Sequence, residues 1–335
     1  MYVEFRPTVP MRVLVLAGGP SSEREISLKS GRAVAQALTD AGHCVSLFDP
    51  RLEQLTSIES LRFDVAFIAL HGRYGEDGAV QQQLEAIGLP YTGSGPAASA
   101  LAFSKSDAKS RFQESGVATP DAVTFDVDDS IDDCIQRAAP LGFPVVVKPD
   151  RQGSSIGISF AHNSDELVTA IETALAFDAK GVIETAIIGE EWTVPLLDDM
   201  VLPPIRIGTP HAFFDYEAKY LREDTAYEFP EDTPIDRINL IVETAQQAAQ
   251  ALGATSLSRV DLRVDSSGKP WVLEVNTVPG LTDHSLAPKS AARRGMSFPA
   301  LCEEVCLRAI AAHREQSYRH DRQNIPGRRE IRRAS

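Results

Sequence analysis

Two short segments near the end of the chain carry polar residues at alternate positions. One valine separates Arg259 from Asp261, another separates Glu274 from Asn276, and a Ser-Ser-Gly turn lies between the two segments. Because side chains alternate between the faces of a strand, each pair lies on one face, and neighbouring strands bring the two pairs together. Carboxylate and amide oxygens suit Mg²⁺ that is bound together with substrate phosphates. A hairpin with a solvated polar face has the same pattern, so both interpretations stay open at this point.

A glycine- and serine-rich loop is the second feature that could bind phosphate. The run Gly153-Ser154-Ser155-Ile156-Gly157 lies between two expected strands, and its backbone N–H groups could hold phosphate oxygens. A surface turn would look much the same. The run does not complete the P-loop pattern, and Gly18-Gly19-Pro20 does not complete the dinucleotide-binding pattern, so neither common nucleotide motif is present in the sequence.

Two lysines, Lys105 and Lys148, are either phosphate ligands or ordinary surface residues. Lys148 follows three valines and precedes a proline, so its ammonium group stands at the end of a buried strand. That location favours a ligand role for Lys148.

The composition is that of a multi-domain globular protein. The chain has 335 residues, of which 43% are hydrophobic, enough for more than one domain-sized core. Its formal net charge of -14 disfavours nucleic acid as a partner, because nucleic acid requires a basic surface. No apolar run approaches the roughly 20 residues that cross a bilayer, and the N-terminus lacks the apolar core of a signal peptide. We therefore expect a cytoplasmic protein that does not bind membranes.

The four cysteines are too scattered for a disulfide framework in a chain of this length. Cys302 and Cys306 lie one helical turn apart, but no further cysteine or histidine pair accompanies them as metal ligands. We expect both to pack inside a helix.

The first part of the chain alternates strands and helices with short connections. Ser22 and Glu25 are spaced as a capping-box pair for a helix that ends near residue 42. The expected strands are 13–17, 44–48 and 64–70. This alternation predicts a doubly wound α/β domain, whose ligands bind beyond the carboxyl ends of the strands. The segment 71–78 stands at such an end.

From about residue 117 the pattern changes to a compact α+β unit. Asn163 and Glu166 are spaced as a second capping pair, for a helix that ends near residue 177. The other expected helices are 131–139 and 235–252, and the expected strands are 143–148, 158–160, 182–184, 259–264 and 271–275. The tail 313–335 is rich in arginine but poor in apolar side chains, so we expect it to be disordered.

The order of these features resembles that of the D-alanine–D-alanine ligase family, from residue 11 to residue 312. Any one motif is weak, whereas the ordered set is highly specific. The motifs that carry the resemblance are Gly18-Gly19, Ser22-Glu23-Arg24-Glu25-Ile26-Ser27, His71-Gly72, Gly75-Glu76-Asp77-Gly78, Pro90-Tyr91-Thr92-Gly93-Ser94-Gly95, Val147-Lys148-Pro149, Gly153-Ser154-Ser155, Tyr216-Glu217-Ala218-Lys219-Tyr220, Arg259-Val260-Asp261 and Glu274-Val275-Asn276-Thr277-Val278-Pro279-Gly280. The departures from the family pattern are Ser258, Leu281 and Tyr74, and they remove no charged catalytic group.

The resemblance implies a fold and a reaction. The fold is an ATP-grasp fold of combined α/β and α+β class, with an N-terminal extension and a C-terminal tail. Its expected parts are the extension 1–10, an N-terminal doubly wound α/β domain 11–116, a central α+β domain 117–200, a C-terminal α+β domain 201–312 and the tail 313–335. ATP phosphorylates the carboxylate of one D-alanine and leaves as ADP, and the amine of a second D-alanine attacks the acyl phosphate and releases phosphate. The product, D-alanyl-D-alanine, serves peptidoglycan synthesis, and a homodimer is expected.

The resemblance also assigns roles around the amino-acid substrates. Glu23 receives the ammonium group of the first D-alanine, and His71 lies beside that substrate. Arg259 and the backbone N–H of Gly280 stabilise the tetrahedral intermediate. The carboxylate of the second D-alanine binds at Ser285 and Leu286.

The remaining matched residues face the nucleotide and its metal ions. The ATP ligands are Lys105, Lys148 and Lys219 at the phosphates, Ser154 and Ser155 in the loop above them, and Glu184 and Glu191 at adenine and ribose. The ligands of two Mg²⁺ ions are Asp261, Glu274 and Asn276, with Glu274 bridging the ions and Mn²⁺ as a substitute metal. Tyr220 is expected to hydrogen-bond Ser154 and, through it, Glu23.

Two other interpretations stay open. A ligase of the same fold could accept another D-amino acid or a D-hydroxy acid as its second substrate. A catalytically silent ATP-binding regulator could also keep the fold, but every charged position of the expected site is present, which such a protein would not require.

Overall fold

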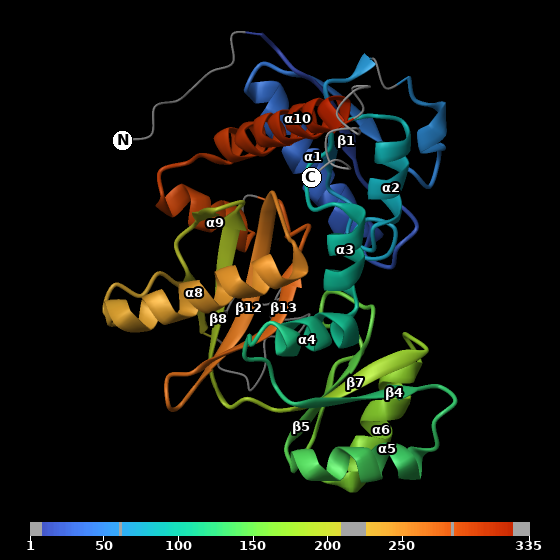
Figure 1. The fold of residues 1–335 in the computed structure, drawn as a ribbon, viewed down its shortest axis with the longest axis vertical. Coiled ribbons are helices and arrows are strands. Elements are labelled where there is room, and N and C mark those ends of the chain that lie inside the picture. The colour runs from blue at the N-terminus through green and yellow to red at the C-terminus, as the bar shows by residue number, and fades with distance from the viewer. Residues whose placement is uncertain (1–8, 60–61, 209–225, 283–284, 324–335) are drawn as a thin grey trace, which may run out of the picture.

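The computed structural model of the chain describes residues 9–59, 62–208, 226–282 and 285–323. Three β-sheets follow one another along the long axis of the molecule, and helices cover each of them (Figure 1). The first sheet is parallel, and the other two are antiparallel. The predicted combination of α/β and α+β units is confirmed.

The middle strand of the parallel sheet is apolar on both faces, as expected for a sheet that helices cover on both sides. Val13 and Val15 of its middle strand pack in one buried cluster with Leu301 and Val305 of the last helix. The elements of this layer are β1 (Arg12–Leu16), β2 (Cys44–Phe48) and β3 (Val65–Ile68) in the order β2-β1-β3, with helices α1 (Arg24–Asp40), η1 (Leu55–Ser57), α2 (Ala79–Ala86) and α10 (Phe298–Gln323). The two ends of the chain thus build one layer.

The start of α1 differs from the prediction. The helix begins at Arg24, its N-cap is Glu23, and no side chain caps it, so the predicted Ser22 and Glu25 capping pair is wrong. The Ser22 hydroxyl instead accepts a hydrogen bond from Nε2 of Gln152, at 3.2 Å, in the glycine-rich loop. The Ser22 hydroxyl therefore bonds a distant segment of the chain and does not cap α1.

The small antiparallel sheet carries its two helices on one face. Phe125, Val147 and Ile183 of three strands pack there with Leu167 and Ile171. The elements are β4 (Ala122–Asp126), β5 (Val145–Pro149), β6 (Ser159–Ala161) and β7 (Lys180–Thr185) in the order β4-β7-β5-β6, with α5 (Ile131–Ala138), η3 (Ala139–Leu141) and α6 (Ser164–Leu175).

The second capping pair is confirmed at the start of α6. The side-chain oxygen of Asn163 accepts a hydrogen bond from the Glu166 N–H at 3.0 Å, and the Asn163 amide donates to the Glu166 carboxylate at 2.7 Å. This helix therefore begins where its sequence alone predicts.

The large antiparallel sheet lies in the middle of the molecule (Figure 1). Trp192, Val260 and Leu262 of its central strands pack with Phe112 and Ala245 of two covering helices. Its strands run in the order β11-β10-β8-β12-β13, with β9 beside β8: β8 (Gly189–Leu197), β9 (Met200–Val201), β10 (Ile205–Gly208), β11 (Ala226–Glu228), β12 (Leu257–Asp265) and β13 (Pro270–Asn276). The helices of this layer are α3 (Pro96–Phe103), α4 (Lys105–Glu114), α8 (Ile235–Leu252) and α9 (Leu286–Arg293). Strand β8 belongs to this sheet, although we expected residues up to 200 in the central unit; the domain boundaries remain a proposal.

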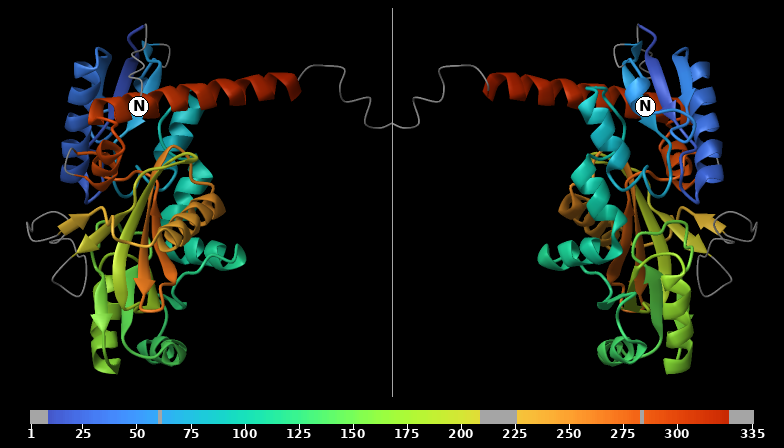
Figure 2. Two further views of the ribbon diagram at one scale, coloured as in Figure 1. Left: turned by 90° about the vertical axis from the view of Figure 1, so that its left-hand side faces the viewer. Right: turned by 90° about the vertical axis from the view of Figure 1, so that its right-hand side faces the viewer.

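The last helix continues beyond the expected end of the folded body. Cys302 and Cys306 are fully buried in it, as predicted. The prediction of disorder from residue 313 is wrong as far as Gln323, because α10 continues to that residue and extends away from the body (Figure 2). A helix satisfies its own backbone hydrogen bonds, so it needs no apolar partner at every turn. Residues 324–335 lie outside the described part. No helix in the described ranges is long and apolar enough to span a membrane.

Candidate active site

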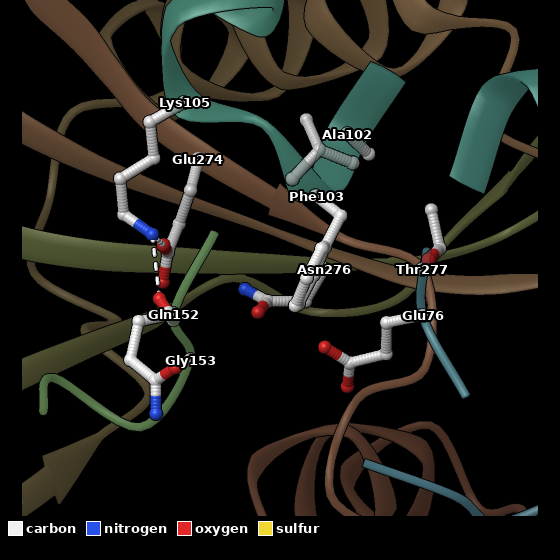
Figure 3. A pocket seen from close by; sticks show the side chains of 10 residues that line it. Glu76, Ala102, Phe103, Lys105, Gln152, Gly153, Glu274, Asn276 and Thr277 are labelled. Atoms are coloured by element: carbon white, nitrogen blue, oxygen red, sulfur yellow. Dashed lines mark hydrogen bonds and ion pairs between the residues drawn. The ribbon is translucent and has the colours of Figure 1, made fainter. Parts of the chain in front are cut away.

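A pocket forms where the loop after β3, the glycine-rich loop, the junction of α3 and α4 and the end of β13 meet (Figure 3). Four separate stretches of the chain thereby contribute to one space. The polar side chains that line it belong to Glu76, Lys105, Gln152, Glu274, Asn276 and Thr277.

The hairpin of β12 and β13 brings its polar residues together, as predicted. The register pairs Arg259 with Asn276 and Asp261 with Glu274. Arg259 donates from Nε and Nη2 to the two oxygens of Asp261 at 2.8 and 2.7 Å, and Thr193 of β8 donates to the same carboxylate at 2.6 Å. Asn276 Nδ2 lies 3.2 Å from Asp261 Oδ2. The pattern on one strand pair therefore becomes a polar cluster anchored by a third strand.

The oxygen donors of this hairpin fit a cation that is shared with phosphates. Within the described residues, no three His, Cys, Asp or Glu side chains gather closely enough to hold a metal ion by themselves. Two carboxylates, Asp261 and Glu274, and the amide of Asn276 would form the protein part of a ligand set. Mg²⁺ commonly takes only one or two carboxylates from the protein and completes its shell with phosphate and water oxygens. The side chains therefore suit Mg²⁺ bound with a nucleotide.

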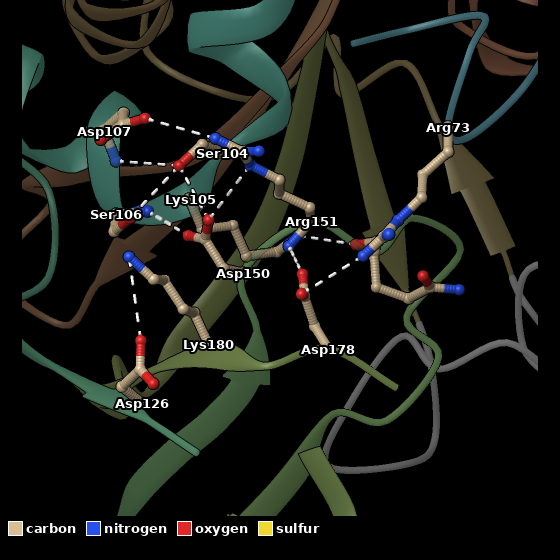
Figure 4. A network of polar contacts seen from close by, with 11 residues as sticks. Arg73, Ser104, Lys105, Ser106, Asp107, Asp126, Asp150, Arg151, Asp178 and Lys180 are labelled. Carbon is tan, nitrogen blue, oxygen red and sulfur yellow. Dashed lines mark hydrogen bonds and ion pairs between the residues drawn. The ribbon is translucent and has the colours of Figure 1, made fainter. Parts of the chain in front are cut away.

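Lys105 stands opposite this hairpin at the start of α4. Its ammonium donates to the carbonyl of Gln152 at 2.7 Å and lies 4.0 Å from Oε2 of Glu274 (Figure 3). The start of α4 is fastened to the end of β5, because Asp150 accepts hydrogen bonds from the Ser104 hydroxyl at 2.9 Å and the Ser106 N–H at 2.8 Å (Figure 4). Lys105 is thereby held beside the glycine-rich loop.

A second polar network connects the parallel-sheet layer to the small sheet. Arg73, in the loop after β3, donates to Asp178 Oδ1 at 3.2 Å, and the backbone N–H of Arg151 donates to Asp178 Oδ2 at 2.7 Å (Figure 4). Asp178 therefore links Arg73, in the loop after β3, to Arg151, which lies directly before the glycine-rich loop.

The glycine-rich loop reaches Glu23 directly. Ser154 donates a hydrogen bond to Oε1 of Glu23, which is only 6% exposed. A Cβ on Gly153 would lie 2.7 Å from Oε2 of Glu23, so a side chain at this position would require the Glu23 carboxylate to move. Ser154 and Ser155 have φ angles of 52° and 56°, in the left-handed region, which is costly for serine and is held by the surrounding contacts.

His71 lies between a hydroxyl and a carboxylate. Its Nε2 is 3.0 Å from the Ser30 hydroxyl, and its Nδ1 is 3.4 Å from Oε1 of Glu76. Burial raises the pKa of Glu76 to about 7, the charge of Glu23 adds to the rise, and the hydrogen bond with His71 opposes it. The sequence analysis did not assign Glu76, although its Gly-Glu-Asp-Gly motif at the end of β3 was a usable signal.

Lys148 belongs to a buried group of three charged residues. Its ammonium contacts Oε1 of Glu184, and Lys109 Nζ lies 2.7 Å from Oε2 of the same carboxylate. Burial alone would raise the pKa of Glu184, but the charges of Lys109 and Lys148 outweigh it and lower the pKa to about 2. The sequence analysis missed Lys109, whose position one helical turn after Lys105 was the available signal.

The remaining predicted residues are distributed around this centre. Glu191 of β8 is buried and pairs with Arg263 Nη2 at 2.9 Å. A Cβ on Gly280 would lie 3.1 Å from the hydroxyl of Ser285, which is the N-cap residue of α9. Leu286 packs with Ile205 and Ile207 of β10. Lys219 and Tyr220 lie outside the described residues.

Comparison with known families finds two matching models. The model described as D-ala D-ala ligase C-terminus matches residues 112–306, and that described as D-ala D-ala ligase N-terminus matches residues 48–94. A D-alanine–D-alanine ligase of Pseudomonas putida (strain GB-1) is 44% identical over 300 residues, covering 90% of this chain and 93% of that protein. One of Stutzerimonas stutzeri (strain A1501) is 47% identical over 290 residues, covering 87% of this chain and 91% of that protein.

Solved structures of similar fold agree with these matches. The D-alanine–D-alanine ligase of Bacillus anthracis complexed with ATP has a TM-score of 0.81 at 32% identity and covers 91% of this chain and 99% of its own. The VanG D-Ala:D-Ser ligase of Enterococcus faecalis has a TM-score of 0.76 at 28% identity and covers 89% of this chain and 98% of its own. Both of these bacterial relatives are thus named D-alanine–D-alanine ligases, and the solved structures include an enzyme named for a different second amino acid.

Proposed function

We propose that this chain, which belongs to the D-alanine–D-alanine ligase family of ATP-grasp enzymes, uses the pocket between its three sheets to join two D-alanine molecules. The activity is that of an ATP-dependent D-alanine–D-alanine ligase, which serves peptidoglycan synthesis. The observation that carries the assignment of the site is the closeness of Lys105 to Glu274 across the pocket, 4.0 Å apart, because it joins a phosphate-binding cation to the metal-binding hairpin.

The nucleotide lies, in this proposal, between the small and the large antiparallel sheets. Lys105 and Lys148 neutralise its phosphates, with Lys219, and Ser154 and Ser155 cover them. Glu184 and Glu191 belong to the adenine and ribose end. A transferring phosphoryl group needs positioning and charge neutralisation more than covalent chemistry, which fits a site of lysines and backbone N–H groups.

Two Mg²⁺ ions, for which Mn²⁺ can substitute, would be held by Asp261, Glu274 and Asn276, with Glu274 shared between them. When bound, they supply positive charge to the phosphate oxygens. The chain itself orients this carboxylate set, because Arg259 and Thr193 fix the rotamer of Asp261.

Glu23 binds the ammonium group of the first D-alanine, with His71 beside it, so that the carboxylate of this substrate faces the γ-phosphate. The second D-alanine, held by its carboxylate at Ser285 and Leu286, attacks the acyl phosphate with its free amine. Arg259 and the Gly280 N–H stabilise the tetrahedral oxyanion, and phosphate leaves. The contact of Ser154 with Glu23 supports a loop that excludes water from the acyl phosphate.

The test is a phosphate-release assay with ATP, Mg²⁺ and D-alanine, followed by mass analysis of the product. We expect release of phosphate and a D-alanyl-D-alanine product. A product with another second residue from mixtures of D-alanine, D-serine and D-lactate supports the broader ligase, and ATP binding without phosphate release supports the silent regulator.

Tyr220 is the residue that we propose selects the second substrate. A tyrosine that hydrogen-bonds Ser154 orders the loop over both substrates, and its loss relaxes selection for an amine nucleophile. In direct competition between D-alanine and D-lactate, Tyr220→Phe is expected to gain D-lactate use, most visibly below neutral pH, where the amine is protonated. An unchanged product ratio at every pH would leave Tyr220 as a packing residue.

We propose a cytoplasmic homodimer, as the family resemblance implies. Sedimentation of the purified chain tests the dimer, and a sedimenting species of about 36 kDa, the mass of one chain, would refute it.

A further inference from the structure

Lys109 is almost completely enclosed, and the reaction described above gives it no role. It is 5% exposed, on α4, and three acceptors surround its ammonium group. These are Thr119 Oγ1 at 3.0 Å, the Pro120 carbonyl at 3.0 Å and Glu184 Oε2 at 2.7 Å. Lys109 thus makes two hydrogen bonds and one ion pair.

Lys148 differs from Lys109 in this respect. Within the part of the chain that the structure describes, the Lys148 ammonium contacts one acceptor, Oε1 of Glu184. Of the two lysines that share Glu184, Lys148 is therefore held by fewer contacts, and it is the one that can turn toward a further anion.

The charges of the three residues lead to the same asymmetry. Two ammonium groups surround one carboxylate, so the buried group carries one excess positive charge that a phosphate can neutralise. Glu184 is 1% exposed, and a buried carboxylate that loses its only counter-ion is strongly destabilised. If Lys148 turned toward a phosphate in the absence of Lys109, it would leave such a carboxylate behind.

We propose that Lys109 is a positioning residue for ATP: it neutralises Glu184 permanently, so that Lys148 can transfer from Glu184 to the nucleotide phosphates. Lys109 acts through Glu184 and Lys148 and does not touch the nucleotide. The proposal rests on the proposed function, since Lys148 is assigned there to the phosphates.

The surroundings of Lys109 fix it in this place. Its acceptors Thr119 and Pro120 lie in the connection between α4 and β4, and the Thr119 hydroxyl donates to the Val272 carbonyl of β13 at 2.9 Å. Lys109 thus stands at the junction of the small and large sheets, between which the nucleotide is proposed to bind. It stays in place while Lys148 moves.

The test compares Lys109→Met with the double variant Lys109→Met/Glu184→Gln in calorimetric titrations with ADP and Mg²⁺. We expect Lys109→Met to weaken ADP binding at least about tenfold, because Glu184 then retains Lys148. Glu184 is itself assigned to the adenine and ribose end, so the double variant is compared with Glu184→Gln alone. In that background no carboxylate retains Lys148, and loss of Lys109 should change the affinity for ADP by less than about threefold. In steady-state assays, the KM for ATP should rise in Lys109→Met while the KM for D-alanine changes less than about twofold.

A purely structural lysine predicts a different pattern, since its loss should weaken ADP binding equally with and without the Glu184 carboxylate. Unchanged ADP affinity in Lys109→Met overturns the proposal, and so does a Lys109→Met effect that is as large in the Glu184→Gln background as in the unmodified chain. If Lys109→Met does not accumulate as folded protein, the double variant and Lys109→Arg decide. ADP affinity within about threefold of Glu184→Gln in the double variant, and close to the unmodified chain in Lys109→Arg, supports the proposal, and a larger loss in the double variant refutes it.

Lys148→Met separates this proposal from the proposed function. If Lys148→Met binds ADP as tightly as the unmodified chain, the assignment of Lys148 to the phosphates fails. If Lys148→Met loses affinity and Lys109→Met does not, only the role of Lys109 fails.

Discussion

Glu274 is the part of the hairpin cluster that remains accessible to a ligand. Its side chain is 30% exposed, while Arg259 and Thr193 already occupy the oxygens of its neighbour Asp261. Asp261 is therefore held in one orientation by its hydrogen bonds, whereas Glu274 faces the pocket.

We predict that Glu274→Gln lowers turnover by about 100-fold or more, because an amide cannot supply the negative charge that two shared cations require. The melting temperature should stay within about 2 °C, since Glu274 makes no close contact that the fold depends on. The exposed Glu172→Gln, on α6, is the matched control and should keep full activity. Near-normal turnover of Glu274→Gln at saturating Mg²⁺ would reject the metal assignment.

Glu76 gives a prediction for the pH dependence of stability. Its folded-state pKa of about 7 lies above the usual glutamate value of 4.5, so between these pH values the folded state binds more protons than the unfolded state. The free energy of unfolding therefore falls as pH rises from about 4.5 to 7. Glu76→Gln, which cannot ionise, should leave stability unchanged at pH 4 and raise it by roughly 1–3 kcal/mol at pH 8.

Urea unfolding of Glu76→Gln at both pH values measures this effect. The exposed Glu53→Gln serves as the control and should show no such difference. A Glu76→Gln variant that is equally stable relative to the unmodified chain at pH 4 and pH 8 would contradict the raised pKa.

The glycine-rich loop is the element that brings the layers together at the site. The Ser154–Glu23 and Gln152–Ser22 contacts connect it to the start of α1, and Lys105 binds its backbone at Gln152. These contacts require the backbone of the loop to pass close to Glu23.

We predict that Gly153→Ala raises the KM for D-alanine by about tenfold or more, with a smaller effect on the KM for ATP, because its Cβ would lie 2.7 Å from Oε2 of Glu23. Gly153 does not have a positive φ, so the effect is steric and not conformational. Gly95→Ala is the matched control, because its Cβ would come no closer than 3.9 Å to the Tyr91 hydroxyl. Equal KM values for D-alanine in the two variants would show that the loop does not need to approach Glu23.

Helix α10 joins the two ends of the chain, because it packs on the first sheet. Leu301 and Val305 lie in the same buried cluster as Val13 of β1 and Phe67 of β3, which come from the opposite end of the chain. The far end of α10 is different, since residues 314–318 are exposed.

We predict that Leu301→Ala lowers the free energy of unfolding by about 2–5 kcal/mol, because it leaves a cavity where the two ends of the chain pack.

Deletion of residues 313–335 should change the melting temperature and dipeptide synthesis little. Calorimetry of both proteins measures the contrast. A large loss of stability on deletion would show that the exposed end of α10 supports the fold.

Local pattern determined many of the elements. Helix α8 has the predicted bounds, the strands agree within a few residues, and the Asn163 cap is present, because hydrophobic period and capping depend on neighbours in sequence. The same holds for the hairpin site, where alternation and a short turn bring Arg259, Asp261 and Asn276 together. The family, too, follows from the amino-acid sequence alone, because its motifs are recognised by their order along the chain.

Only the tertiary structure decided which buried charges share a site and where distant elements pack. Lys109, Lys148 and Glu184 come from α4, β5 and β7, and their grouping depends on burial, which makes unpaired charge costly wherever the chain places it. The pairing of His71 with Glu76, the loss of the Ser22 cap to Gln152 and the packing of α10 on the first sheet have the same origin. Sequence spacing reports on neighbours within a helix or strand pair, whereas these contacts are selected by the free energy of the whole packed molecule.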